Sequence, residues 1–251
     1  MVLNFILLFL TAMIAGSLVF IAPAFKDKYF KLVLVFAGSY LFSITIIHII
    51  PELFTTASST SKMGLYILIG FLLQQILEYL SSGIEHGHIH LHDHGTGKGS
   101  VVTVMLGLFI HSFLEGTLLS HEHLIMGVPQ SMGHVHSGKS VLLGIIMHKG
   151  PAAFALAAVL SSALSRKWTW IFLTLFALAS PLGMLLSSVV FQNGWLDKES
   201  INILYGLVAG GFLHISTTIF FESSPNHKLQ VSKLLVSFLA AGLAIISEFL
   251  L

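Results

Sequence analysis

Apolar runs long enough to cross a bilayer as helices constrain this chain more than any other feature. Hydrophobic residues make up 55% of its 251 residues and charged residues only 9%, whereas a soluble domain is about a quarter charged. The runs do not alternate in polarity, which favours helices over a membrane barrel. We predict an all-α polytopic membrane bundle with eight transmembrane helices, at about residues 2–23, 32–54, 64–83, 100–121, 139–163, 168–190, 200–222 and 230–250.

Basic residues are distributed unevenly among the loops between these runs. The first, third, fifth and seventh loops hold eight of them, and the second, fourth and sixth loops hold three. Because positive residues favour the cytoplasmic side, we predict cytoplasmic odd-numbered loops and both termini outside. We expect 1–251 to form a single transmembrane domain. The formal net charge of +1 does not indicate nucleic acid as a partner.

Two loops are rich in histidine. In the predicted cytoplasmic loop 84–99 the histidines stand at alternate positions, and the predicted outer loop 121–138 carries four more. Alternate imidazoles can hold a borderline cation, so loop 84–99 is either a metal-capturing segment or a tolerant polar linker. The outer loop leaves the same two interpretations open. The candidate capturing residues are His86, His88, His90, His92 and His94.

The stretch IHSFLEG keeps a histidine and a carboxylate inside the fourth run. His111 and Glu115 are four residues apart, so a helix places both on one face. Ionisable groups at this depth are costly and usually mark an ion or substrate path. An imidazole nitrogen and a carboxylate oxygen at this spacing can bind one divalent cation. Ser112 adds a hydroxyl beside them.

The stretch MHKGPAAF supplies a second histidine from the fifth run. Pro151 cannot donate to the carbonyl of Met147, so we expect a kink or a freed acceptor near His148. A cleft between the fourth and fifth helices would bring His148 together with His111 and Glu115. Two imidazoles and one carboxylate suit Zn²⁺, with water or a fourth residue completing the shell. The chain has no cysteine, which excludes thiolate ligands.

Two further positions are open to more than one interpretation. His214 in the seventh run, taken alone, is better explained by a structural hydrogen bond than by metal binding. His48 and Glu52 in HIIPEL repeat the four-residue spacing on either side of Pro51. This pair lies near the end of its run, where lining a path, ending the helix and binding metal directly all fit the pattern.

Taken in order, these motifs resemble those of the ZIP (Zrt/Irt-like) family of divalent metal transporters. HIIPEL is similar to the second-span pattern, IHSFLEG to the fourth and MHKGPAAF to the fifth, while ASPLGMLL and AGGFLHIS fit the sixth and seventh. The resemblance covers essentially the whole chain. It implies eight helices with both termini outside, and a transport bundle that moves against a scaffold forming a homodimer.

The resemblance also implies roles for individual residues. His111, Glu115 and His148 fall on the primary metal site, whereas Ser112 and Lys149 fall where members with two metals bind the second. Lys149 replaces a carboxylate, and an ammonium cannot ligate a metal while it is protonated. We therefore expect one tightly held ion, with Lys149 either standing in for a second cation or pairing with Glu115 when the site is empty.

Other positions also depart from the family pattern. Ala152 stands where many members have a further ligand, and Ile219 falls where relatives have a carboxylate. Glu222, close by, is an open candidate for an exit ligand. The secondary or path-lining candidates are thus Ser112, Lys149, His48, Glu52, His214 and Glu222.

We expect an importer that carries a divalent ion into the cytoplasm by alternating access, with Zn²⁺ ahead of Fe²⁺, Mn²⁺, Cd²⁺ or Co²⁺. Its partners would be the ion and the lipid bilayer, and it would need no cofactor beyond the transported metal. A membrane metal sensor that uses loop 84–99 is the alternative. An intramembrane metalloenzyme is disfavoured because Lys149 occupies the Glu position of a His-Glu-x-x-His motif. Short loops and the absence of appended domains favour a bacterial plasma membrane.

Overall fold

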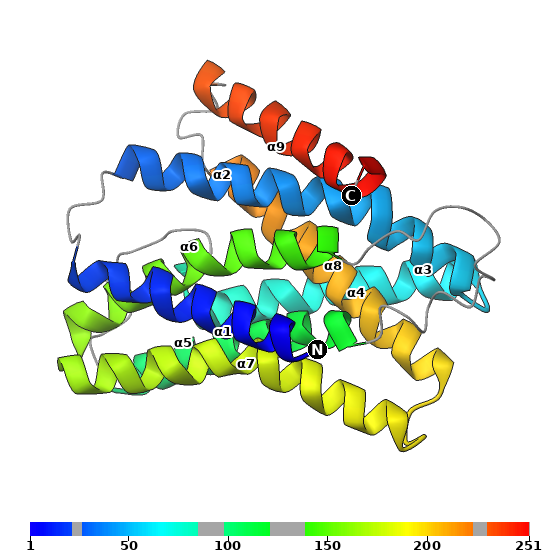
Figure 1. The fold of residues 1–251 in the computed structure, drawn as a ribbon, viewed down its shortest axis with the longest axis horizontal. Helices are drawn as coiled ribbons and strands as arrows, with labels where there is room; N and C mark the ends of the chain where they lie inside the picture. Colours follow the sequence, from blue (N-terminus) through cyan, green and yellow to red (C-terminus); the bar gives the residue numbers. More distant parts are fainter. Residues whose placement is uncertain (22–26, 85–97, 121–138, 223–229, 251) are drawn as a thin grey trace.

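The computed structural model describes residues 1–21, 27–84, 98–120, 139–222 and 230–250, and the regular structure in these residues is helical (Figure 1). A π-helical turn, Thr45–Ile49, joins α2 to α3, and short 3-10 turns follow α1 and α5. The α-helices are α1 (Val2–Ser17), α2 (Asp27–Ile44), α3 (Ile50–Thr56), α4 (Thr60–Ser81), α5 (Lys98–Thr117), α6 (Lys139–Ala163), α7 (Arg166–Gln192), α8 (Lys198–Glu222) and α9 (Val231–Leu250).

The helices follow the predicted spans closely. Seven helical segments of the described chain are long and apolar enough to cross a bilayer, and a shorter apolar stretch, Val101–Thr117, lies in α5. The all-helical class is therefore confirmed, while eight crossings and the placement of both termini outside stay predictions. The histidines of loops 84–99 and 121–138 lie outside the described residues, so their capture of metal also stays a prediction.

The helices pack as two groups. In the first group α7 contacts α1, α5 and α6, and α1 also lies along α6. In the second group α4 lies along α8, and α2 lies along both α8 and α9. Figure 1 shows α2 and α9 side by side along one edge of the molecule, with α1, α5 and α7 along the opposite edge. The two groups meet chiefly where α4 contacts α5 and where α2 contacts α6.

Close packing within each group depends on glycine. A Cβ placed on Gly116 of α5 would lie 1.9 Å from the carbonyl oxygen of Ser180 in α7. In the second group, a Cβ on Gly210 of α8 would lie 1.9 Å from the carbonyl oxygen of Ile67 in α4. Small residues allow such close approach of helix backbones in a membrane, where association depends on close packing rather than on burial from water.

The π-turn ends at Ile49, two residues before Pro51. Proline offers no N–H to the carbonyl four residues earlier, and single π-turns inside α-helices are frequent at functional sites. His48 lies in this turn and Glu52 lies in the first turn of α3. The helix continues to Thr56, so Pro51 marks an internal change of helix type and not the end of the span.

Candidate metal centre

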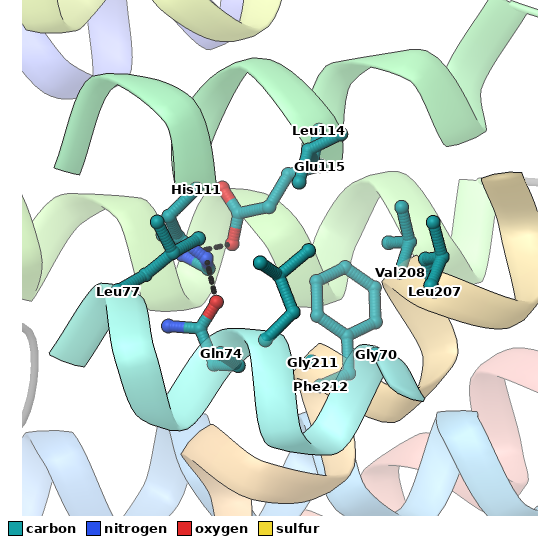
Figure 2. Close-up of a pocket in the computed structure, with 11 residues that line it drawn as sticks. Gly70, Gln74, Leu77, His111, Leu114, Glu115, Leu207, Val208, Gly211 and Phe212 are labelled. Carbon is teal, nitrogen blue, oxygen red and sulfur yellow. Dashed lines mark hydrogen bonds and ion pairs between the residues drawn. The ribbon is translucent and has the colours of Figure 1, made fainter. Parts of the chain in front are cut away.

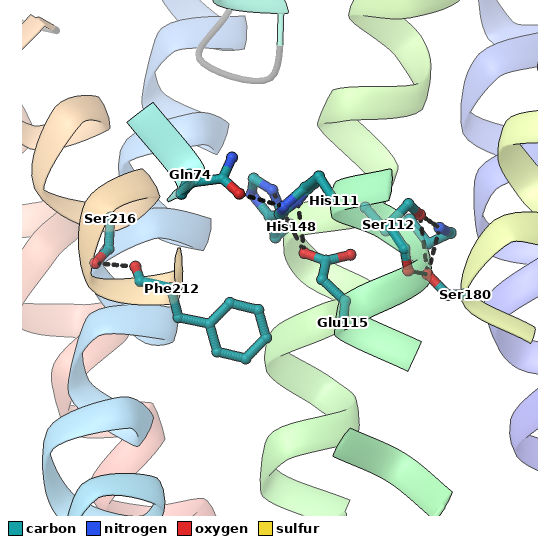
Figure 3. A network of polar contacts seen from close by, with 9 residues as sticks. Gln74, His111, Ser112, Glu115, His148, Ser180, Phe212 and Ser216 are labelled. Atoms are coloured by element: carbon teal, nitrogen blue, oxygen red, sulfur yellow. Dashed lines mark hydrogen bonds and ion pairs between the residues drawn. The ribbon is translucent and has the colours of Figure 1, made fainter. Parts of the chain in front are cut away.

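Three ionisable side chains meet between α5 and α6. Nε2 of His111 lies 3.0 Å from Oε1 of Glu115, one turn further along α5, and Nε2 of His148 in α6 lies 3.9 Å from the same oxygen. One ligand atom from each of the three residues lies within 4.8 Å of the others (Figure 3). Pro151 lies inside α6, one turn beyond His148. The structure thus brings together the three residues that the sequence grouped.

The distances in this cluster suit one small cation. Two atoms that each lie about 2.1 Å from Zn²⁺ at a tetrahedral angle are about 3.4 Å apart, which falls between the two measured separations. The exposed fractions of His111, Glu115 and His148 are 5%, 2% and 1%. A carboxylate so far from water is costly unless it is paired or coordinates a metal. Small side-chain rotations would allow all three residues to coordinate one ion.

A cavity adjoins two of these residues. His111 and Glu115 line it together with Gln74 of α4 and Phe212 of α8, and its other walls are apolar side chains and glycines of α4, α5 and α8 (Figure 2). We expected a cleft between the fourth and fifth spans, which are α5 and α6. This cavity lies instead where the first helix group faces α4 and α8. A route between α5 and α6 therefore stays a prediction.

Gln74 is hydrogen-bonded to the His111 ring at Nδ1, the nitrogen that does not face Glu115. Its Oε1 lies 3.0 Å from Nδ1 of His111, and the side chain is only 3% exposed. An amide oxygen only accepts hydrogen bonds, so Nδ1 is the donor. This leaves Nε2 of His111 directed at Glu115. Figures 2 and 3 both show Gln74 reaching from α4 to the ring.

Lys149 is held by hydroxyls. Its buried ammonium donates to Oγ of Ser112 in α5 and to Oγ of Ser180 in α7, the latter at 2.7 Å. The nitrogen also lies 4.5 Å from the ring centroid of Phe176, an attractive position for a cation. The pairing with Glu115 that we expected as one alternative is not among these contacts. Ser112 and Lys149, which fall where members with two metals bind the second ion, contact each other, and the expectation that the Lys149 charge stands in for a second cation stays a prediction.

His48 bridges two carboxylates. Its Nδ1 lies 2.7 Å from Oε1 of Glu248 in α9, and its Nε2 lies 3.3 Å from Oε2 of Glu52. His48 and Glu52 thus share a cluster with Glu248, which the sequence reading did not single out. Path lining and metal binding by His48 and Glu52 both stay predictions.

The remaining candidates lie on α8. Nε2 of His214 contacts Oε2 of Glu78 in α4, and the ring meets Phe71 edge-on with centroids 4.8 Å apart. This is the kind of structural contact that the sequence favoured for His214. Ile219 is 3% exposed and packs in the core. Glu222 ends α8, and its side chain lies outside the described residues.

The chain is similar in sequence to known membrane transporters. Residues 85–248, more than half of its length, match the model of the ZIP zinc transporter family. The chain belongs to the ZIP zinc transporter family. The matched region contains His111, Glu115 and His148, so the whole centre lies within the part of the chain that matches the family model.

Several relatives of this ZIP chain are named zinc transporters. Zinc transporter ZIP1 of Danio rerio is 32% identical over 152 residues, which are 57% of this chain and 45% of the relative. Zinc transporter ZIP9-B of Xenopus laevis is 27% identical over 162 residues, 62% of this chain and 50% of the relative. Protein zntD of Dictyostelium discoideum is 28% identical over 150 residues, which are 20% of that protein. This ZIP chain thus matches half or less of each relative's length.

Three polar residues of this ZIP chain contact the candidate site residues but were not predicted from the sequence. Gln74 and Glu78 stand four residues apart in the third apolar run, and Glu248 stands in the last run. Each was visible as a polar side chain inside an apolar segment, which is the signal that drew attention to His111. Their partners lie on other helices, and the sequence alone does not say which helix faces which.

Proposed function

We propose that this chain transports divalent metal ions across a membrane, with Zn²⁺ as its main substrate. The observation that carries the proposal is the buried set of one carboxylate and two imidazoles, with ligand atoms within 4.8 Å of one another, inside an apolar helical bundle. Membership of the ZIP family and the relatives named zinc transporters support it.

In import by alternating access, the three ligands would replace water around the ion when it binds, and water would replace them when it leaves. The ion exchanges part of its hydration shell for His111, Glu115 and His148, crosses while it is bound, and is rehydrated on the far side. The site must bind strongly enough to select and weakly enough to release. In this scheme Zn²⁺ is favoured by imidazole ligands, while Fe²⁺, Mn²⁺, Cd²⁺ and Co²⁺ remain alternative substrates.

An elevator-like movement fits the division of the helices. All three proposed ligands lie on α5 and α6, which belong to the first helix group. If this group moves against the second, the ligands move with it as a unit. The second group, α2, α4, α8 and α9, is then the scaffold, and a homodimer formed through it remains part of the proposal.

Import into the cytoplasm is proposed from the resemblance to the ZIP family, and the distribution of basic residues supports only the orientation of the chain in the membrane. Cytoplasmic odd-numbered loops would place both termini outside. The relatives named above are eukaryotic, so they lend no support to the bacterial plasma membrane that the short loops favoured. What the family match and the apolar helices do support is a multi-pass membrane protein.

The family match favours transport over the two other functions considered. ZIP proteins are transporters, so an intramembrane metalloenzyme has no support here. A metal sensor would depend on His86, His88, His90, His92 and His94, which lie outside the described residues. No contact in the described part of the chain favours that alternative.

Uptake by purified protein in liposomes tests the proposal. Wild-type protein should accumulate Zn²⁺, and Glu115→Ala should lower uptake at least 100-fold, because the carboxylate is the one anionic ligand of the set. Glu199→Ala, which changes an exposed glutamate at the start of α8, is the matched control and should transport normally. Absence of uptake of any divalent ion by folded wild-type protein would reject the transport function. Normal uptake by Glu115→Ala would reject only this site.

A further inference from the structure

The hydrogen bond between Gln74 and His111 crosses the boundary between the two helix groups. Gln74 lies on α4, and α4 is packed tightly on α8: a Cβ on Gly70 would lie 2.1 Å from the carbonyl oxygen of Leu207. His111 lies on α5, which is packed equally tightly on α7 through the glycine contact described above. The donor and the acceptor are therefore each fixed to a different group.

The contact has a defined chemical effect on the ring. With Nδ1 of His111 donating to the amide oxygen of Gln74 at 3.0 Å, the lone pair available for a cation is on Nε2, the nitrogen that lies 3.0 Å from Glu115. A hydrogen bond to the nitrogen that does not bind metal fixes both the tautomer and the orientation of a ligating histidine. Because Gln74 is buried, bulk water does not readily replace it.

We propose that Gln74 is a positioning residue that orients His111 for the transported ion only while the two helix groups keep the arrangement seen here. The inference rests on the proposed function. If α5 moves relative to α4, this hydrogen bond breaks and His111 is no longer held for binding. Gln74 thereby makes the affinity for the ion depend on the conformation, so that the ion is held in one arrangement and released in another.

Three variants on one helix test this role. Gln74→Leu removes the acceptor and keeps an apolar side chain of similar size. Gln74→Glu keeps an oxygen acceptor at the same reach. Gln75→Leu makes the identical change one residue further on α4, where the side chain is exposed. The Kd for Co²⁺, measured on purified protein by its visible absorption, and the KM and maximal rate of Zn²⁺ uptake are compared with wild type.

We expect Gln74→Leu to raise Kd and KM about 10–100-fold, the usual effect of losing a partner of a metal-binding histidine, with an unchanged or higher maximal rate. Gln74→Glu should restore Kd to within a few fold of wild type, and Gln75→Leu should match wild type. If Gln74→Leu does not fold, Gln74→Ala takes its place. A wild-type Kd in the acceptor-less variant, or a lowered maximal rate with normal Kd, overturns the role of Gln74. Neither result affects the transport function, which fails only if wild-type protein takes up no ion.

Discussion

At the scale of single residues, the two histidines of the metal centre must be neutral to bind an ion. A protonated imidazole has two donors and no lone pair to offer, so metal binding releases protons and weakens in acid. We therefore expect Zn²⁺ uptake to fall at least tenfold as the pH drops through about 6–7, where histidine usually titrates. Uptake into liposomes buffered to the same pH on both sides measures this. A flat profile from about pH 5 to 8 would rule out ligation by His111 and His148.

Some residues of the candidate site could be predicted from the sequence, and others could not. The four-residue interval between His111 and Glu115 was enough to place both on one helix face. His148 was grouped with them because the next apolar run also carries a histidine at similar depth. The same reasoning could not place Lys149. Its partners, Ser112 and Ser180, lie 37 and 31 residues away in sequence, and only the tertiary arrangement of α5, α6 and α7 brings all three together. Binding of metal by the three grouped residues stays a prediction.

At the scale of elements, the glycine contact between α5 and α7 sets the position of the centre. A Cβ on Gly116 would lie 1.9 Å from a backbone oxygen of Ser180, and backbone cannot rotate away as a side chain can. We expect Gly116→Ala to push α5 from α7 and to destabilise the protein by about 2–3 kcal/mol, as overpacking commonly does. Thermal unfolding in detergent would record this as a melting temperature several degrees lower.

Gly242→Ala is the matched control for this change. It also places a methyl group in a helix interior, but nothing lies within 4 Å of a Cβ built there on α9. Alanine is favoured over glycine in helices by about 0.5–1 kcal/mol, so the melting temperature should be unchanged or slightly higher. Equal melting temperatures for Gly116→Ala and wild type would mean that α5 and α7 do not depend on this contact.

Helix positions were the easiest part of the fold to predict. Continuous apolar runs locate them because lipid leaves few other ways to satisfy the backbone. The π-turn before Pro51 was harder, since proline indicates a break without saying whether the helix stops or continues. His48 and Glu52 therefore carried three interpretations, and the extension of the helix to Thr56 excludes only the one in which they end the helix. Their partner Glu248, on α9, required the tertiary arrangement.

At the scale of the whole molecule, the two helix groups predict which cross-links stop transport. A Cβ on Gly107 of α5 would lie 3.2 Å from Cβ of Leu80 in α4, across the boundary between the groups. The same Cβ would lie 2.8 Å from the carbonyl oxygen of Leu77, so α4 and α5 must separate slightly to admit it. Disulfides join Cβ atoms about 3.5–4.5 Å apart, and this separation moves the two Cβ atoms toward that range. In this cysteine-free chain, Leu80→Cys with Gly107→Cys should lose most Zn²⁺ uptake on oxidation and regain it on reduction.

A second pair of cysteines, placed within one helix group, is the control for the effect of a disulfide that does not immobilise the groups. A Cβ on Gly206 of α8 would lie 2.9 Å from Cβ of Tyr66 in α4, within one group. Tyr66→Cys with Gly206→Cys should therefore keep its uptake when oxidised. If the bridge between Leu80 and Gly107 forms and transport continues, the two groups do not need to move against each other.

The hydroxyl-bound ammonium of Lys149 has a consequence for energetics. With Glu115 ionised and Lys149 charged, the empty centre carries one negative and one positive charge and is neutral overall, whereas the loaded centre carries the two positive charges of the ion. A loaded crossing would then be electrogenic and an empty return would not. Two charges gain about 4.6 kcal/mol for each 100 mV of membrane voltage, so an inside-negative potential alone could drive accumulation of the metal.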